Sequence, residues 1–348
     1  MREVAQCAQV STSTVSLALR NSPLVSAKTR LRIRQLAASL RYQTHPFVAA
    51  HMRSRRKPQA NPSPPALALV DTQRQRHGWR DHFNTMLHET FLGAKAQARA
   101  RGYETREFWL HEPGVSHTRF SEILRARGIH GVLIGPSSDL QLKLDFKWEW
   151  FSVVRLGSAR FSPLLHRVVI DHYQAGRLAA QKVHELGFRR PGLTVREPFG
   201  VAHDRGYEAG FQTACAYLPA MRPVPPLFTP NVPDGRTLIR WVRRHRPDVI
   251  IDAEERHNYD LLRAARWRVP ADIAVLSLCA PYPPGPFSGC VQNGQMVGRA
   301  GIDHLVAMIE RNETGLPTGP VTLSTGLTWN LGETLRPKAD AASPSEIG

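Results

Sequence analysis

The chain has 348 residues, 42% of them apolar, which is too many for one ordinary core and favours two lobes with a small appendage. Its 46 lysines and arginines against 29 acidic residues give a net charge of +17, which points to a polyanionic partner. No apolar run approaches the about 18 residues of a membrane span, and no basic-then-apolar leader is present, so we expect a soluble cytoplasmic protein without a membrane partner.

More than half of the net positive charge lies in the first sixth of the chain. Residues 1–59 contain eleven lysines and arginines but one acidic residue, Glu3, which is a net charge of +10. A segregated basic segment of this kind is typical of a nucleic-acid-binding module attached to a body of more balanced charge. We therefore expect double-stranded DNA to bind this end of the protein.

The pattern over residues 2–41 predicts three short helices joined by tight connections. In the stretch VSTSTVSLAL, Ser11 or Thr12 can cap the second helix. Val15 and Leu19 are four residues apart and face a core, while Leu17 falls on the opposite side. Small hydroxyl residues on the exposed side allow close approach to DNA, so the pattern predicts a helix-turn-helix with residues 12–20 as its recognition helix.

The stretches VAQCAQVSTSTVSLALRN and VSAKTRLRIRQLAASLRY together resemble the DNA-binding headpiece of the lactose-repressor (LacI/GalR) family. That resemblance implies base contacts, groove contacts and phosphate contacts from ten positions: Ser11, Thr12, Ser13, Ser16, Leu17, Asn21, Ser26, Thr29, Tyr42 and Met52. Two positions depart from the family. Gln9 stands where the turn usually has glycine, and Leu17 often corresponds to arginine, so Leu17 would suit a thymine methyl group.

The segment HPFVAAHM, residues 45–52, resembles the family's hinge helix, which inserts an apolar side chain into the minor groove. The register leaves either His51 or Met52 at that position. Met52 is favoured because its side chain has no polar group that would lose its hydrogen bonds between the bases. A plain linker is the alternative interpretation. Residues 54–65 are basic and proline-rich, which predicts a semi-rigid linker.

Strands and helices alternate from residue 66 onward, which predicts parallel sheets covered by helices. The expected fold class is an all-α helix-turn-helix headpiece followed by an α/β two-lobed, periplasmic-binding-protein-like effector domain with two doubly wound parallel sheets. The predicted boundaries are as follows: headpiece 1–44; hinge and linker 45–65; effector domain 66–335, with lobe 1 at about 66–157 and 285–312 and lobe 2 at about 158–284 and 313–335; polar tail 336–348. A late helix and a terminal strand pair complete the prediction, within residues 290–312 and 320–335.

Residues 66–335 are similar to the family's effector domain, with RGYEAGF and WNLGETL among the matching motifs. The resemblance implies a small-molecule effector, a carbohydrate or a sugar acid or phosphate, held between the lobes. The candidate contacts are Asp71, Arg74, Arg205, Glu254 and Asn293. Three of them have a structural alternative, namely a strand-end cap for Asp71, a surface ion pair for Arg205 and a helix cap for Asn293. Cys279 replaces a usual aspartate, which departs from the family's ligand chemistry.

The sequence shows no nucleotide-binding, nucleophile-elbow or metal-ligand motif, and its cysteines are widely spaced, so we expect no enzyme activity, cofactor or metal. The predicted function is a transcriptional regulator, most simply a repressor, that binds a pseudo-palindromic operator as a homodimer. The helices near 83–101 and 257–266 are candidate dimer faces. The alternatives are a cytoplasmic small-solute-binding protein, which the basic headpiece argues against, and a non-specific architectural DNA binder, which has no use for the large body.

Overall fold

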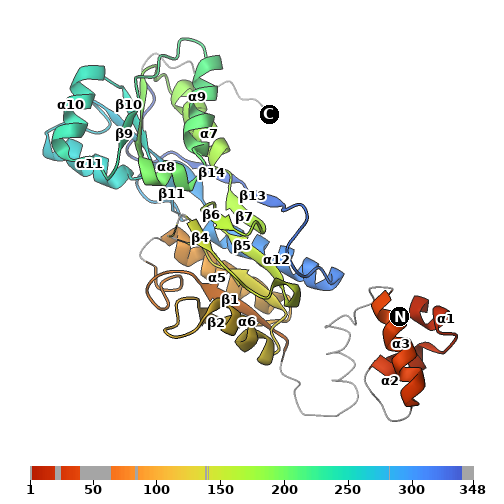
Figure 1. Cartoon of the computed structure of the whole chain (residues 1–348). Helices are drawn as coiled ribbons and strands as arrows, with labels where there is room; N and C mark the ends of the chain where they lie inside the picture. Colours follow the sequence, from red (N-terminus) through yellow and green to blue (C-terminus); the bar gives the residue numbers. More distant parts are fainter. Residues whose placement is uncertain are drawn as a thin grey trace.

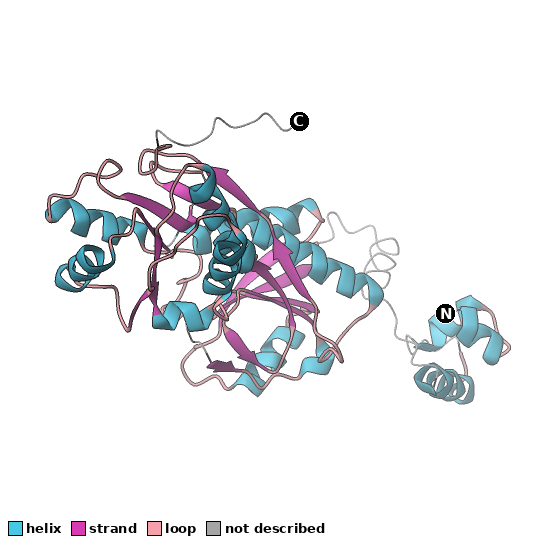
Figure 2. Ribbon diagram, turned by 90° about the horizontal axis from the view of Figure 1, so that it is seen from above, coloured by secondary structure: helices cyan, strands magenta, loops and turns pink. Residues whose placement is uncertain are grey.

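The computed structural model describes residues 2–19, 25–39, 64–82, 85–137, 139, 141–281 and 283–338. A helical headpiece is followed by a body in which helices flank two main sheets (Figures 1 and 2). Within the ranges given, no helix combines the length and apolar character needed to cross a membrane.

The described part of the headpiece consists of α1 (Arg2–Cys7), α2 (Thr12–Leu19) and α3 (Ala27–Ser39), as the sequence predicted. Its core is small and made of short side chains: Val4, Ala5, Ala8, Val15, Ala18, Val25, Ile33 and Ala37. The guanidinium of Arg32 donates to the carbonyl of Ala8 at 2.9 Å, which ties α3 to the turn after α1. These contacts fix the crossing of the three helices and thereby the surface that α2 presents.

The first main sheet is parallel throughout and has the order β13-β7-β5-β3-β1-β2. Its strands are β1 (Ala66–Asp71), β2 (Glu104–Trp109), β3 (Gly131–Ile134), β5 (Ser152–Leu156), β7 (His166–Ile170) and β13 (Thr322–Thr325). One face packs on α5 (Thr85–Ala100) and α12 (Gly294–Arg311). The other face packs on α6 (His117–Ala126), η1 (Trp148–Trp150) and a small sheet of β4 (Gln141–Lys143) and β6 (Arg160–Ser162).

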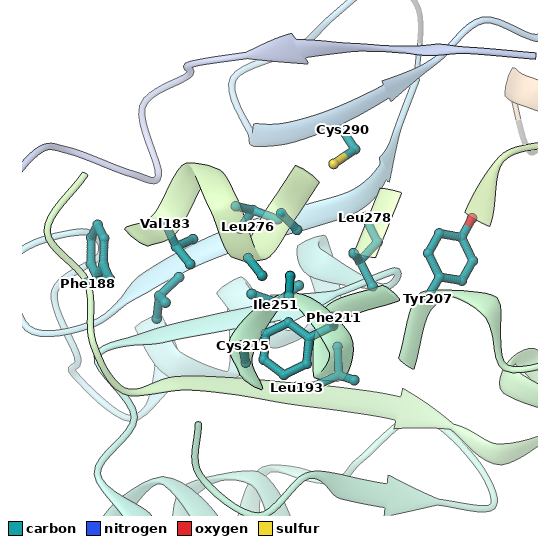
Figure 3. Close-up of a cluster of buried hydrophobic side chains, with 14 of the residues drawn as sticks. Val183, Phe188, Leu193, Tyr207, Phe211, Cys215, Ile251, Leu276, Leu278 and Cys290 are labelled. Carbon is teal, nitrogen blue, oxygen red and sulfur yellow. The ribbon is translucent and has the colours of Figure 1, made fainter. Parts of the chain in front are cut away.

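The second main sheet has the order β14-β12-β11-β10-β8-β9, with β14 antiparallel to β12. Its strands are β8 (Pro191–Arg196), β9 (Leu227–Thr229), β10 (Val249–Asp252), β11 (Ala274–Ala280), β12 (Ser288–Gln292) and β14 (Leu327–Asn330). Figure 3 shows the core on one face, beneath α7 (His172–Glu185) and α9 (Gly206–Tyr217). The opposite face packs on α10 (Gly235–His245) and α11 (Glu255–Ala264), and α8 (Glu197–Ala202) follows β8.

The sequence-based lobe boundaries are wrong for three strands. β7 belongs to the first sheet although residues 158–284 were predicted to form lobe 2, and β12 belongs to the second sheet although 285–312 were predicted for lobe 1. β13 and β14 are not a strand pair, because β13 joins the first sheet and β14 the second. The pattern of apolar residues in a strand shows that the segment is a strand and which of its faces are buried. It does not identify the neighbouring strand to which it hydrogen-bonds.

The chain crosses between the lobes after β7, after β12 and between β13 and β14. Because β7, β12 and β13 all run toward a crossing, the carboxyl ends of both sheets lie at the junction of the lobes. This is the edge at which open α/β sheets place their ligands. Asp171 caps α7 at one crossing, accepting a hydrogen bond from the N–H of Gln174 at 2.9 Å, as expected from its position.

Glycines allow the helix pairs in both lobes to approach closely. A Cβ on Gly298 of α12 would overlap the backbone carbonyl of Thr90 on α5, and a Cβ on Gly210 of α9 would overlap that of Tyr173 on α7. Gly210 is part of the motif RGYEAGF. One role of this motif is therefore to seat α9 against α7 and so to fix the position of Arg205 at the start of α9.

Gln9 adopts the left-handed conformation, with φ of 49°, in the turn between α1 and α2. This conformation costs a residue with a Cβ roughly 1 kcal/mol of folding free energy, whereas glycine adopts it without that cost. We expect Gln9→Gly to raise the stability of the headpiece by about 1 kcal/mol, measured as slower hydrogen exchange of the buried amides of α1–α3. Gln6→Gly, within α1, is the control and should destabilise by a similar amount. Faster exchange in Gln9→Gly would contradict this account.

Candidate functional site

The candidate DNA-binding surface is the N-terminal part of α2. Ser11 caps this helix, since its Oγ accepts a hydrogen bond from the N–H of Thr14 at 3.1 Å. Thr12 and Ser13 follow in the first turn with exposed side chains. This arrangement exposes small hydroxyl groups on the surface where a recognition helix meets base edges.

The start of α3 repeats the same capping geometry. Ser26 Oγ accepts from the N–H of Thr29 at 3.2 Å, and the two hydroxyl groups lie 2.8 Å apart. Helix N-termini attract phosphate through their free N–H groups and dipole. Phosphate contact by these two residues stays a prediction.

The environment of Leu17 differs from the sequence prediction. Its side chain is half-buried and packs against the headpiece core, in which Ala18 is buried along with Val15, while the side chain of Leu19 is not among those described. A core built from so few small residues recruits Leu17 as an additional apolar contact. The helical position of Ser16 is described but its side chain is not, and Asn21, Tyr42, His51 and Met52 lie outside the described residues.

In the body, a pocket opens in the second lobe at the carboxyl ends of β8, β10 and β11. Its lining combines acidic and aromatic side chains with one arginine: Thr194, Val195, Arg196, Phe199, Tyr207, Glu208, Asp252, Ala253, Glu254 and Leu278. Burial raises the pKa of Asp252 to about 7 and also raises the pKa of Glu208. One carboxylate oxygen of Glu208, Oε2, is buried without a hydrogen-bond partner. Such acceptors suit the hydroxyl groups of a polyol.

Arg205 lies at the rim of this pocket. Its guanidinium pairs with Glu197 at 2.6 Å and with Glu208 at 3.4 Å, while its side chain remains 46% exposed. The residue itself has φ of 53°, a left-handed conformation that non-glycine residues adopt mostly where surrounding structure imposes it. Arg205 is therefore both ion-paired and accessible, as a ligand-binding arginine would be.

Glu254 and Asn293 are also placed at the carboxyl ends of the second sheet. Glu254 lines the pocket and pairs with Nε of Arg196 at 2.6 Å. Asn293 caps α12, accepting a hydrogen bond from the N–H of Met296 at 3.2 Å. Cys279, in β11, donates its thiol to the carbonyl of Ala253 at 3.3 Å. The cap at Asn293 gives this residue a structural role, and its effector contact stays a prediction.

Asp71 has a structural role at the end of β1. Its buried carboxylate accepts hydrogen bonds from the N–H groups of Gln73 at 2.9 Å and Trp79 at 3.1 Å. Burial raises its pKa, and these hydrogen bonds oppose the rise. Both oxygens thus hold the following loop, as in the strand-end cap that was the structural alternative.

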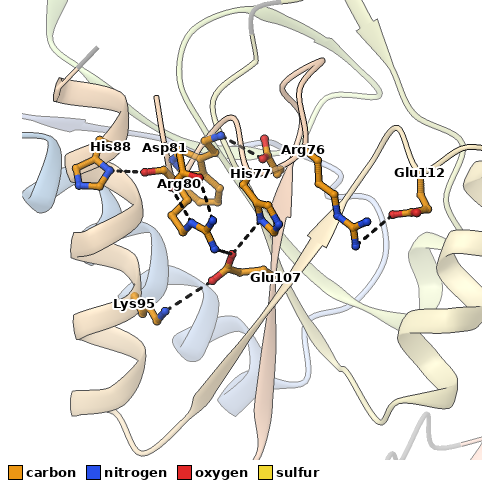
Figure 4. A network of polar contacts seen from close by, with 10 residues as sticks. Arg76, His77, Arg80, Asp81, His88, Lys95, Glu107 and Glu112 are labelled. Carbon is orange, nitrogen blue, oxygen red and sulfur yellow. Dashed lines mark hydrogen bonds and ion pairs between the residues drawn. The ribbon is translucent and has the colours of Figure 1, made fainter. Parts of the chain in front are cut away.

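A polar network fastens this loop to β2 (Figure 4). Glu107 of β2 lies 3.7 Å from Nδ1 of His77, 3.5 Å from Arg80 and 3.6 Å from Lys95. Arg74 is exposed on the same loop. The structure thus places Asp71 and Arg74 on the first lobe, and Arg205 and Glu254 on the second.

Sequence reasoning missed several residues that the junction of the lobes brings together. They are Arg155, His172, His203, Tyr207, Glu208 and Asp252. A signal was present for two of them, because Arg155 interrupts the buried strand SVVRL and Asp252 ends the buried strand VIID. Among the described residues, no group of three or more histidine, cysteine or acidic side chains could hold a metal ion.

Comparison with known proteins agrees with this geometry. A family model described as bacterial regulatory proteins of the lacI family matches residues 1–45, and a model of a periplasmic binding protein-like domain matches residues 180–330. No curated protein sequence matches the chain.

Several solved structures share the fold. A transcriptional regulator CelR–cellobiose complex is 21% identical with a TM-score of 0.56, over 95% of this chain and 98% of that one. A lac repressor dimer bound to operator and the anti-inducer ONPF is 18% identical with a TM-score of 0.55, over 95% and 97%. A LacI family regulator from Enterococcus faecium with bound ribose is 15% identical with a TM-score of 0.54, over 78% and 99%. The chain thus joins a headpiece that matches the lacI family of bacterial regulatory proteins to a body that matches a periplasmic binding protein-like domain.

Proposed function

We propose that the protein is a sequence-specific DNA-binding transcriptional repressor whose operator affinity is controlled by a small molecule bound between its two lobes. The observation that carries the proposal is the headpiece, in which a capped α2 exposes Thr12 and Ser13 within a segment of strongly positive charge. Positive charge supplies affinity for the phosphates, and the exposed helix supplies base readout.

The protein acts on a pseudo-palindromic site as a homodimer, because paired recognition helices one helical turn apart match such a site. The lac repressor structure is described as a dimer on operator, which supports this arrangement by similarity. We place the dimer faces on α5 and α11. Leu92 of α5 keeps 38% of its surface exposed, as an unpaired interface residue does.

The effector is a sugar or sugar derivative. Bound cellobiose and ribose in two similar structures support this class. We place the ligand against Arg205, Glu208 and Glu254 at the carboxyl ends of the second sheet. A ligand that contacts both lobes stabilises one lobe orientation over another and thereby alters the spacing of the headpieces.

Selection of binding sites from a random duplex library tests the DNA-binding part. The full chain should enrich a pseudo-palindrome and bind it at physiological salt at least about 1,000-fold more tightly than a scrambled duplex. Equal affinity for both duplexes would refute sequence-specific regulation and favour non-specific DNA binding.

Arg205→Ala tests the effector part. In a thermal-shift screen against sugars, sugar acids and sugar phosphates, a ligand that raises the Tm of the wild type should lose most of its effect on Arg205→Ala, because a charged hydrogen bond contributes about 1.5–3 kcal/mol. Arg244→Ala, an exposed arginine on α10, is the matched control and should respond fully. A full response by Arg205→Ala would show that the ligand binds elsewhere.

A further inference from the structure

Arg155 is a buried cation at the carboxyl end of β5, with 5% of its surface exposed. Its Nη1 donates to the carbonyl oxygen of Gly157 at 2.7 Å, and its guanidinium lies 5.4 Å from the ring centre of Phe161. Its Nε is buried and has no hydrogen-bond partner. The carbonyl and the ring carry no full negative charge, and the charge of Asp204 only partly offsets the cost of burial, so a further anion would stabilise the guanidinium.

The surroundings of Arg155 are rich in basic groups. Burial and the nearby charge of Arg167 together lower the pKa of Arg155 to about 10, while the charge of Asp204 opposes the shift. Burial, His203 and Arg167 together lower the pKa of His172 to about 2, so its imidazole is neutral. The pKa of His203 is lowered as well, mainly by burial. The charge of Arg167 contributes to the shifts of both Arg155 and His172, and a negative group bound beside Arg155 would offset that repulsion.

The polar groups around Arg155 come from both lobes. Arg155 belongs to the first sheet, whereas Asp204 lies in the turn between α8 and α9 of the second lobe. Ser158, just after β5, lies 3.4 Å from Nδ1 of His172, whose ring packs 4.5 Å from that of His203. Asp204 has φ of 49°, a conformation that functional turns retain at an energetic cost. Because the charge of Asp204 acts on Arg155 from the second lobe, an anion at Arg155 would lie close to both lobes.

We propose that the effector carries an anionic oxygen group, a carboxylate or a phosphate, which binds the guanidinium of Arg155. This inference rests on the proposed function, because it names the chemical class of the ligand at that junction. An arginine guanidinium presents two parallel N–H donors, which match the oxygens of a carboxylate or of a phosphate. The unpartnered Nε of Arg155 supplies one of these donors. The carboxylates of the second-lobe pocket then accept hydrogen bonds from the hydroxyl groups of the same ligand.

Inorganic phosphate is the first probe. The full-length protein is titrated with sodium phosphate at constant ionic strength, with sodium chloride making up the balance, and the Tm of the body is recorded. The wild type should show a saturable rise in Tm. Arg127→Gln is the matched control, because Arg127 is also a first-lobe arginine on a phenylalanine ring, 5.3 Å from Phe108, and it should respond as the wild type does.

Arg155→Gln should lose the phosphate response, and Arg155→Lys, which keeps the charge but lacks the planar pair of donors, should bind phosphate several-fold more weakly. The proposal would be overturned if the wild type showed no saturable response, or if both Arg155 variants responded as strongly as the wild type. Binding of the selected duplex is measured separately in chloride without phosphate, so loss of DNA binding would count against the proposed function alone.

Gluconate, glucose 6-phosphate and glucose then distinguish the source of the anion. A larger shift with gluconate supports a carboxylate ligand, and a larger shift with glucose 6-phosphate supports a phosphate ligand. A shift with glucose as large as with both acids would contradict the anionic group.

Discussion

Val15→Asn is expected to unfold the headpiece and abolish DNA binding while the body stays folded. Val15 is fully buried between α2 and α3, in a core made mostly of alanine and valine. The substitution loses about 1.5–3 kcal/mol of apolar burial and strands a polar amide, at a further cost of about 1–3 kcal/mol. A domain of this size has roughly 3–5 kcal/mol of stability to lose.

Fluorescence anisotropy with the selected duplex measures the loss of binding, and calorimetry follows the body. Leu31→Asn is the matched control, because Leu31 on α3 is 60% exposed and carries no core contact to lose. Wild-type affinity in Val15→Asn would show that the headpiece core is not needed for binding.

In the wild type, the free energy of unfolding should fall as the pH rises toward 7 because of Asp252, and Asp252→Asn should remove this fall. Burial raises the pKa of Asp252 from 3.8 to about 7, so the folded protein keeps this proton up to neutral pH while the unfolded chain releases it above about pH 4. The stabilisation is therefore complete below pH 4 and is lost as the pH rises to 7. The difference in pKa corresponds to an order of 4 kcal/mol at most.

Urea unfolding of wild type and Asp252→Asn from pH 5 to pH 8 measures the effect. The free energy of unfolding of the variant, relative to that of the wild type, should rise across this range. The depressed pKa values of His172 and His203 act with the opposite sign, but both chains contain them, so they cancel in the difference.

Asp272→Asn is the control for this experiment. Its ion pair and hydrogen bonds with Arg268 lower the pKa of Asp272 to about 2, so its contribution to stability is constant above pH 5. A parallel pH profile for Asp252→Asn and wild type would show that the Asp252 carboxylate is not destabilised by burial.

Local structure was largely predictable from the sequence, though not everywhere. The helices around Val4 and Val15 and most strands of the body follow from apolar spacing and capping residues. α10 escaped prediction although its signals were present, since Asp234 caps it and Leu238, Trp241 and Val242 recur on one face.

The candidate site was less predictable. Arg205 and Glu254 were identified from the family resemblance, and the structure adds their partners Glu197 and Arg196. Asp71 satisfied the same rule, yet its oxygens are used by backbone N–H groups of its own loop. The sequence shows that a side chain follows a strand and so lies at the edge of the sheet. It does not show which nearby N–H groups will donate hydrogen bonds to that side chain.

The sequence by itself determined the basic helix-turn-helix segment, the alternating strands and helices, and the caps at Ser11 and Asp171, because each depends on residues close together in the chain. Tertiary structure alone decided which sheet each strand joins, and it left Arg155 buried with an unpartnered Nε at the junction of the lobes. Sheet order and burial depend on contacts between residues distant in sequence, and the charge state of a buried group depends on those contacts too.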